Sequence, residues 1–280
     1  MIKKILWKEI EKIIRLSLEE DLGSGDITSA AIFDNHHISV AEIISKEDGI
    51  FCGEDLVKYI YHYLDRKVEV IPFFNDGSKI GKGLKVIQLT GPTKSLLAGE
   101  RTCLNFIQRM SGIATKTFKL VTDLSNSSLK ILDTRKTAPG LRRLDKYAVK
   151  IGGGENHRFG LYDLVMLKDN HLKASGGITE AVQKIKKKYK DKFKIEVETT
   201  TLKEVKEALK NKVDIIMLDN MNKKTMGKAI LEIDEQAKIE ISGNINEKKL
   251  KDFKDLKVDF ISLGSLTHSV KAFDFSMKFI

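Results

Sequence analysis

The stretch FKIEVETTTLKEVKEALKNKVDIIMLD, residues 193–219, decides the predicted fold. Two short, β-prone apolar runs flank a segment with the spacing of a helix, and the runs end at Glu198 and Asp219, 21 residues apart. A strand, a helix and a second strand within that distance form a βα unit. The runs are almost continuously apolar, as expected of parallel strands that are buried on both faces.

The same unit repeats along the second half of the chain. Further steps lead from Asp219 to Ser242 and on to Gly264, over 23 and 22 residues. Repeated βα units build a barrel or an open doubly wound sheet. The polar residue that ends each run favours the barrel, because barrel sites gather at the carboxyl ends of the strands. The apolar runs lie at residues 129–136, 162–168, 193–198, 213–219, 237–242 and 258–265.

These six strands are fewer than the eight of a standard barrel, so we predict an incomplete, six- to seven-stranded α/β barrel. The first hundred residues differ, because strand-like runs alternate there with glycine turns, which indicates a smaller N-terminal α+β domain. We assign residues 1–102 to the N-terminal domain and residues 103–265 to the barrel. The tail, residues 266–280, is expected to pack with the N-terminal domain.

Composition narrows the class of protein. Of the 280 residues, 41% are hydrophobic and 31% are charged, which is typical of a soluble globular protein. No apolar run approaches the roughly 18 residues of a membrane span, and the charged N-terminal segment lacks the apolar core of a signal peptide. We therefore expect a cytoplasmic location and no membrane partner. Cys52 and Cys103 lie far apart without a metal-binding spacing, which indicates two buried free thiols.

The net charge of +10 suggests a polyanionic partner, either nucleic acid or a small anionic substrate. The arginines favour the small substrate, because several lie in glycine-rich segments or at strand ends. The planar guanidinium suits carboxylate and phosphate recognition. The arginines in question are Arg101, Arg135, Arg142, Arg143 and Arg158.

The ends of the predicted strands carry most of the candidate chemistry. The early strands and the loop after the first supply cations, at Arg135, Lys136, Arg158 and Lys168, with His157 beside them. The middle strands supply the carboxylates of Glu198 and Asp219. The last two strands end in SGN and LGS, whose backbone N–H groups can bind a phosphate. We expect a ligand with a phosphate, further anions, and hydroxyls or Mg²⁺ near the carboxylates.

Two other sites are poorly supported by the motifs. His157 and His171 flank a strand, but no cysteine or HExxH spacing accompanies them, so a zinc site is not favoured. A GxxxxGK[ST] phosphate-binding loop is absent from the sequence.

The block DTRKTAPGLRRLDKYAVKIGGGENHRFGLYDLVMLKDNH, residues 133–171, resembles the signature of the quinolinate phosphoribosyltransferase family. This family is also called carboxylating nicotinate-nucleotide pyrophosphorylase. The resemblance covers nearly the whole chain, because EEDLGSGDIT (19–28), LLAGERTCLNFIQRMSGIAT (96–115) and IMLDNM (216–221) occur in the family's order.

The resemblance implies an activity, a cofactor and an assembly. The family transfers phosphoribosyl from phosphoribosyl pyrophosphate to quinolinate, and releases pyrophosphate and carbon dioxide. The product is nicotinate mononucleotide, made for de novo NAD biosynthesis with Mg²⁺ present. The basic unit is a homodimer with shared active sites, and some members assemble further, to hexamers. The fold is an N-terminal α/β domain followed by an incomplete α/β barrel.

The resemblance also assigns roles to residues. Arg101 is expected to reach the substrate of the partner subunit, and His171 to orient Lys168. The quinolinate pocket is expected to include Arg135, His157, Arg158 and Lys168. Lys136, Glu198 and Asp219 are the expected catalytic residues; Lys136 contacts the pyrophosphate, and the two carboxylates hold the ribose hydroxyls or Mg²⁺. The 5′-phosphate is expected to be held by Ser242, Gly243, Asn244, Gly264, Ser265 and His268, and further substrate contacts are expected from Thr134 and Leu263.

Two alternatives remain open at this point. One is a paralogue of the same fold, associated with molybdenum transport, that uses another acceptor; the cluster of cations favours a dicarboxylate acceptor instead. The other is a basic nucleic-acid-binding protein, for which the sequence offers no RNP, KH or zinc-finger motif.

Overall fold

The computed structural model describes the whole chain except residues 1–6, 125–127, 244, 246–249, 251–252 and 254–255. The chain forms two compact units. The first unit contains residues 1–119, 137–154 and 266–280, and the second contains residues 120–136 and 155–265. The domain boundary expected after residue 102 falls inside one long helix, Thr93–Leu124, so the chain divides differently from the expected linear order.

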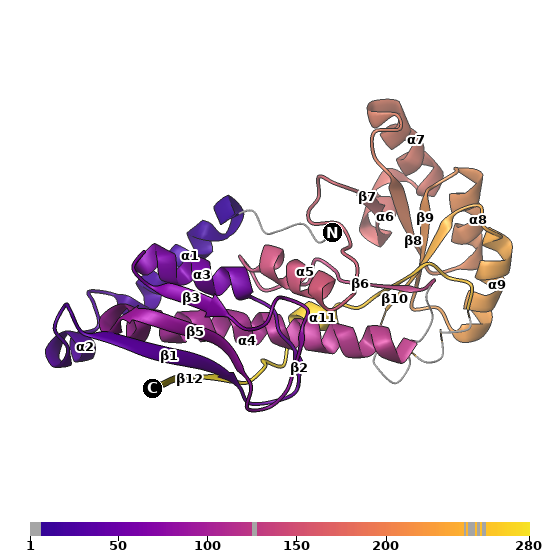
Figure 1. Ribbon diagram of the computed structural model, residues 1–280. Coiled ribbons are helices and arrows are strands. Elements are labelled where there is room, and N and C mark those ends of the chain that lie inside the picture. Colours follow the sequence, from indigo (N-terminus) through magenta and orange to yellow (C-terminus); the bar gives the residue numbers. More distant parts are fainter. Residues whose placement is uncertain (1–6, 125–127, 244, 246–249, 251–252, 254–255) are drawn as a thin grey trace. The chain divides into compact units, whose positions relative to one another are not determined.

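The first unit is built on a four-stranded antiparallel sheet in the order β12-β1-β5-β3. Figure 1 shows β12, from the C-terminal end, lying beside β1. Ile43, Ile87 and Leu89 of this sheet are fully buried. The bounds of its elements are α1 Trp7–Leu22, α2 Ile27–Ile32, β1 Ile38–Ser45, β2 Gly49–Ile50, α3 Glu54–Leu64, β3 Glu69–Pro72, β4 Lys79–Ile80, β5 Lys85–Pro92, α4 Thr93–Leu124 (to residue 119), α5 Arg142–Ile151 and β12 Phe275–Phe279.

Helices of the first unit follow the apolar periodicity of the sequence. Ile10, Ile14 and Leu18 recur at helical spacing in α1, and all three are buried. Cys52 and Cys103 are free and buried, as the sequence predicted. Burial raises the pKa of both thiols, because the thiolate is poorly solvated there.

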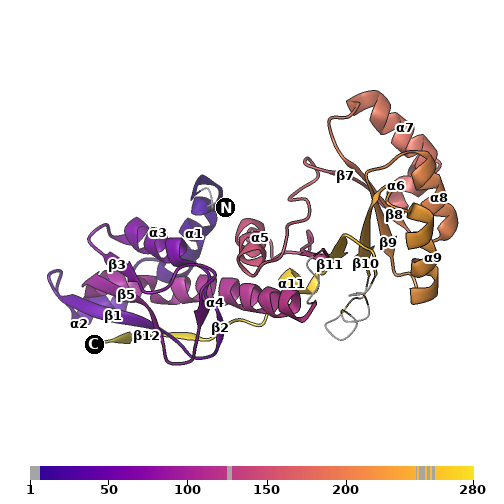
Figure 2. The same ribbon diagram turned by 45° about the vertical axis from the view of Figure 1, so that its right-hand side comes forward.

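The second unit is a parallel sheet of six strands in the order β6-β11-β10-β9-β8-β7, which confirms the incomplete α/β barrel. Helices α7, α8 and α9 lie along one face of this sheet in both views (Figures 1 and 2). The bounds are β6 Lys130–Leu132, β7 Val165–Leu167, α6 Asp169–Ser175, α7 Ile178–Tyr189, β8 Ile195–Thr199, α8 Leu202–Lys210, β9 Ile215–Asp219, α9 Lys223–Ile233, β10 Lys238–Ser242 and β11 Phe260–Ser262; the short helix α11, Ser265–His268, links this unit to the tail.

Strand alternation gives the sheet two different faces. Val197, Ile216 and Ile239 share one face and are buried, as expected for the side covered by helices. The register pairs Glu198 with Met217 and Met217 with Glu240, so these three side chains share the other face. The polar residues of the second unit therefore gather on the inner side of the sheet.

Short sequence signals fix where the helices of the second unit begin. Thr201 caps α8: its hydroxyl accepts the N–H of Glu204, and the Glu204 carboxylate accepts the N–H of Thr201 in return. Among the described residues, no helix combines the length and apolar character needed to cross a membrane.

Candidate active site

The predicted carboxylates and Lys168 meet at the carboxyl ends of neighbouring strands in the second unit. Lys168 follows β7, and its Nζ lies 3.1 Å from Oε2 of Glu198 in β8. Asp219 and Ser242 end β9 and β10 and are paired directly in the register of the sheet. These four residues, far apart in the sequence, thus occupy one edge of the sheet.

Two guanidinium groups add positive charge at this edge. Arg158 is only 8% exposed, whereas Arg135 is exposed after β6. The pKa of Arg158 is lowered first by burial and then by the charge of Arg135, while Glu196 and Asp163 act in the opposite direction. Like charges this close repel, and a bound anion relieves that repulsion. The pair is therefore suited to a ligand with more than one negative charge.

The loop that carries Arg158 is tied down by two aspartates. Asp133 is fully buried and accepts hydrogen bonds from Asn156 Nδ2 (2.6 Å) and the His157 backbone N–H (2.9 Å). Asp163 accepts the N–H groups of Phe159 and Gly160. The loop backbone on both sides of Arg158 is therefore fixed. Asp133 was not among the predicted site residues, although it opens the DTRK motif.

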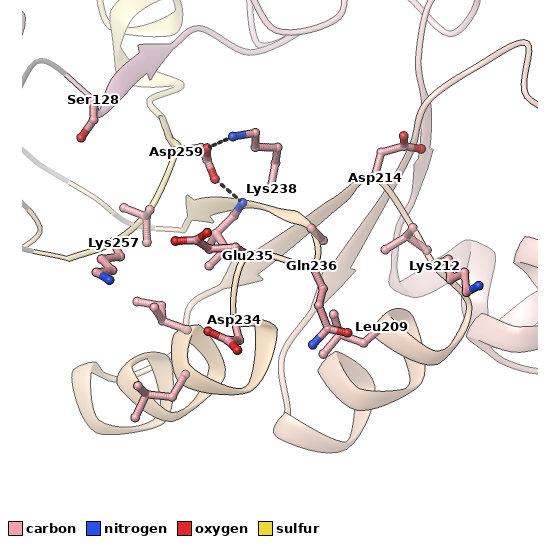
Figure 3. A pocket seen from close by; sticks show the side chains of 16 residues that line it. Ser128, Leu209, Lys212, Asp214, Asp234, Glu235, Gln236, Lys238, Lys257 and Asp259 are labelled. Atoms are coloured by element: carbon pink, nitrogen blue, oxygen red, sulfur yellow. Dashed lines mark hydrogen bonds and ion pairs between the residues drawn. The ribbon is translucent and has the colours of Figure 1, made fainter.

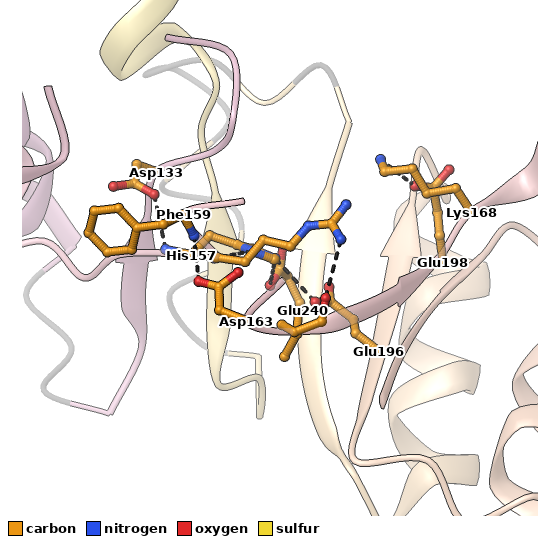
Figure 4. A network of polar contacts seen from close by, with 10 residues as sticks. Asp133, His157, Phe159, Asp163, Lys168, Glu196, Glu198 and Glu240 are labelled. Atoms are coloured by element: carbon orange, nitrogen blue, oxygen red, sulfur yellow. Dashed lines mark hydrogen bonds and ion pairs between the residues drawn. The ribbon is translucent and has the colours of Figure 1, made fainter. Parts of the chain in front are cut away.

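His157, predicted to line the quinolinate pocket, has its imidazole next to two buried acids. Its side chain is 8% exposed, and its Nε2 lies 3.1 Å from Glu196 Oε2 and 3.5 Å from Glu240 Oε2. Figure 4 shows the three side chains pointing toward one another. The expectation of almost continuously apolar strands was wrong at Glu196 and Glu240, which are fully buried. The alternation in KIEVE and KIEIS was the signal, because each glutamate lies two residues before a predicted site residue.

Residues close to Lys136 and Lys168 hold the main chain. The Thr134 hydroxyl accepts the Lys136 N–H at 3.1 Å, and Lys136 itself is exposed. Nδ1 of His171 accepts the Lys168 N–H at 3.1 Å. This contact fits the orienting role predicted for His171, since it fixes the backbone from which Lys168 projects.

The glycine turn after β10 leaves no room for a side chain. Gly243 has φ +94°, and a Cβ there would come within 2.4 Å of the Asn220 side chain. The Asn220 N–H donates to Ser242 O, which closes the turn. Such a turn exposes backbone N–H groups that can face an anion. Asn244, the third predicted residue of this turn, lies outside the described residues.

The last strand leads to the remaining predicted phosphate contacts. Leu263 is buried and donates its N–H to Leu132 O at 2.9 Å, which joins the chain after β11 to β6. Gly264 and Ser265 follow at half-buried positions. His268 is exposed, with Nδ1 2.6 Å from Ser269 Oγ.

Arg101 lies on α4 in the first unit, where it is exposed. It lines a cavity of about 300 Å³ together with Arg109, Asn105 and Glu20. The guanidinium of Arg109 is held by both oxygens of Asp145, at 2.8 Å each. Arg101 is thus presented by the first unit in a recess that already contains a structural ion pair.

The chemistry of Glu198 and Asp219 fits Mg²⁺. Both offer carboxylate oxygens at the carboxyl ends of adjacent strands, and neither side chain is fully buried. Mg²⁺ binds through one or two carboxylates and keeps several waters, so it needs partly open ligands of this kind. Glu198 forms an ion pair with Lys168. Asp219 instead accepts a hydrogen bond from the neutral amide of Asn220, at 2.8 Å from Nδ2.

A larger cavity, of about 920 Å³, lies at the amino ends of the same strands (Figure 3). Three of its charged side chains make structural contacts. Asp259 binds Lys238 Nζ at 2.6 Å and accepts the Ile239 N–H, and Asp214 accepts the Ile195 N–H. These acids fix the beginnings of strands, so the size of this cavity is not a sign of catalysis.

Comparison with known proteins shows the family of the chain. Residues 113–278 match the family domain described as "Quinolinate phosphoribosyl transferase, C-terminal domain", and residues 26–111 match its N-terminal domain. The chain is 45% identical over 269 residues to the probable nicotinate-nucleotide pyrophosphorylase (carboxylating) of Bacillus subtilis (strain 168), covering 96% of this chain and 93% of that protein.

Solved structures show the same similarity. NadC from Streptococcus pyogenes matches with a TM-score of 0.95 and 40% identity, over 99% of this chain and 98% of that one. The nicotinate-nucleotide pyrophosphorylase from Francisella tularensis matches with a TM-score of 0.95 and 39% identity, over 100% and 99% of the two chains. The chain therefore belongs to the quinolinate phosphoribosyltransferase family of enzymes.

Proposed function

We propose that this chain transfers phosphoribosyl from phosphoribosyl pyrophosphate to quinolinate, and that nicotinate mononucleotide, pyrophosphate and carbon dioxide are formed. The observation that supports the acceptor assignment is the buried guanidinium of Arg158, whose pKa is lowered by burial and by the charge of nearby Arg135. Quinolinate is a dianion, and its two carboxylates suit two planar guanidinium groups. Lys168, at the end of the adjoining strand β7, adds a third cation.

The acids and the cations divide the work of the reaction. Displacement at the anomeric carbon passes through a state with positive charge on the sugar, and carboxylates placed beside it stabilise that charge. We assign this role to Glu198 and Asp219. Lys136, exposed beside Arg135, is placed to contact the departing pyrophosphate. Glu198 and Asp219 would hold Mg²⁺, which would supply further neutralisation of the pyrophosphate charge.

The two glycine turns are assigned to the 5′-phosphate. Ser242 and Gly243 present hydroxyl and backbone donors after β10, and Gly264 and Ser265 follow β11. β10 and β11 are neighbours in the sheet, so both turns leave the same edge. Decarboxylation needs little from the protein, because the ring nitrogen that has gained the sugar is cationic and stabilises the electron pair left at the neighbouring carbon.

We also propose a homodimer in which Arg101 completes the site of the partner subunit. What supports this is the location of Arg101: it belongs to the first unit, whereas the other predicted quinolinate contacts belong to the second. A cytoplasmic location stays a prediction from the sequence.

The assay that tests the substrate uses purified chain, Mg²⁺, phosphoribosyl pyrophosphate and either quinolinate or nicotinate. We expect nicotinate mononucleotide and carbon dioxide from quinolinate, and no turnover of nicotinate. Turnover of nicotinate or another base without turnover of quinolinate would contradict the acceptor assignment and favour a paralogue of the same fold.

A further inference from the structure

Two buried glutamates of the second unit have no role in the reaction as assigned above. Glu196 is on β8 and Glu240 on β10, with β9 between them, and they are 0% and 1% exposed. Both oxygens of Glu196 and Oε1 of Glu240 are buried and make no hydrogen bond of regular geometry, although Glu196 Oε2 lies 3.1 Å from His157 Nε2. Buried carboxylates without partners are costly, so their retention in the interior calls for a reason.

The imidazole of His157 lies between the two acids. Its Nε2 is 3.1 Å from Glu196 and 3.5 Å from Glu240, so one N–H can serve both carboxylates (Figure 4). Its other nitrogen, Nδ1, accepts the backbone N–H of Arg158 at 2.6 Å. An acceptor at Nδ1 fixes the neutral tautomer with its proton on Nε2.

This tautomer argues against a metal ion, although the three side chains have ligand atoms within 4.8 Å of one another. A histidine that binds a metal through one nitrogen normally donates a proton from the other. Here the other nitrogen of His157 already faces a donor, so Nε2 keeps its proton. The three side chains are therefore interpreted as sharing the proton on Nε2 and not a metal ion.

We propose that Glu196 and Glu240 are positioning residues of the quinolinate site, which hold His157 by its Nε2–H so that its Nδ1 holds the main chain at Arg158. The proposal rests on the function proposed above. His157 then acts as the link between the interior acids and the main chain that carries the guanidinium. Glu196 also attracts the Arg158 side chain directly, because its charge favours the charged guanidinium.

The surroundings of the cluster fit one shared proton. Burial and the neighbouring Glu196 raise the pKa of Glu240 to about 8, while His157, the Ser262 hydroxyl and Lys168 lower it. The side chain of Arg158 is held further by its bond from Nη1 to Leu164 O at 3.3 Å.

A double-mutant cycle on the full chain tests the proposal, with quinolinate affinity measured by calorimetry and KM measured for each substrate. Glu196→Leu removes the nearer acceptor of the Nε2–H, so quinolinate affinity should fall about tenfold while KM for phosphoribosyl pyrophosphate changes less than about twofold. Glu196→Gln keeps an acceptor oxygen and should stay within about threefold of the unchanged chain. Asp214→Asn, a matched acid-to-amide change directly before β9, should leave both constants unaltered.

The cycle is closed by His157→Asn. If the acid acts through the imidazole, adding Glu196→Leu to His157→Asn should weaken quinolinate binding by no more than about twofold. Independent, multiplying effects would overturn the proposal, as would full quinolinate affinity in Glu196→Leu. An unchanged chain that binds no quinolinate would instead overturn the proposed function.

The tautomer of the His157 ring provides a second test of the proposal. It depends neither on activity nor on the folding of a variant. Histidine-selective ¹⁵N NMR, assigned with His157→Asn, should show a protonated Nε2 and an unprotonated Nδ1 at about pH 7. The opposite tautomer, or an imidazolium, would contradict the arrangement.

Discussion

The two ends of the parallel sheet use charge differently. At the amino ends, two acids have local partners: Asp259 binds Lys238, and Asp214 accepts the N–H of Ile195. At the carboxyl ends, the charge of Arg135 lowers the pKa of Arg158, so two cations lie close together. Paired opposite charges stabilise a fold. Like charges held close together repel one another, and a ligand of opposite charge can relieve that repulsion.

The first prediction asks whether the carboxyl edge is complete within one chain. Arg101→Ala should lower kcat/KM by about 1000-fold, because removal of one partner of a desolvated charge pair is costly. Mixing it with inactive Lys136→Ala protein should restore part of the activity through hybrid dimers. Failure to restore activity, with subunit exchange shown by mass spectrometry, would refute a shared site.

The second prediction contrasts the two ends directly. Arg158→Ala should lower kcat/KM for quinolinate by about 100-fold, since a buried guanidinium contact to a carboxylate is lost. Lys238→Ala breaks the exposed pair with Asp259 and should change kcat/KM by less than about twofold. Steady-state kinetics on both variants measures the two values of kcat/KM. Equal losses of kcat/KM would contradict the predicted difference between the two ends of the sheet.

The third prediction concerns the pH dependence of stability. Folded Glu240 keeps its proton up to about pH 8, whereas the unfolded carboxyl releases it near 4.5. Between these values the folded state binds more protons, so the free energy of unfolding falls as pH rises and levels off above about pH 8. The loss should be on the order of a few kcal/mol, because each unit of pKa difference between the folded and unfolded states is worth about 1.4 kcal/mol.

Urea unfolding at a series of pH values measures this slope. Glu240→Gln resembles the protonated acid in shape and cannot ionise, so its stability should be nearly independent of pH over the same range. A slope that persists in the variant would assign the loss to other groups.

The smallest effect is expected from a residue near the same edge with only a structural role. Thr201→Ala removes the cap of α8 and should lower the free energy of unfolding by about 1 kcal/mol. Thr201→Ser keeps the hydroxyl and should lose much less. Both variants should retain full kcat/KM at saturating Mg²⁺, and a loss of activity would show that the edge is more sensitive than its charges suggest.

The sequence predicted most of the second unit because its information is local. Each apolar run ended at a polar residue, so the six strands and the edge with Lys168, Glu198 and Asp219 followed from period and spacing. The family resemblance supplied roles for these residues, and the structure places them on neighbouring strands of one edge without testing those roles.

Other contacts could not be read from the sequence because they join distant residues. His157 contacts Glu196 and Glu240, whose strands are separated by β9. No sequence motif next to any of these three residues predicts the contact. The pair Arg109 and Asp145 likewise joins residues of two helices. Only the alternation within KIEVE and KIEIS hinted that an acid points inward.

The last strand of the chain determines the order in which the protein can be finished during synthesis. β12, Phe275–Phe279, pairs with β1, Ile38–Ser45, and so completes the sheet that the first residues begin. The second unit ends at residue 265, so its whole sequence leaves the ribosome before β12 does. One edge of β1 therefore stays unpaired until β12 has been synthesised. The sheet of the first unit is completed only after synthesis of the second unit, whereas N-terminal parts usually fold first.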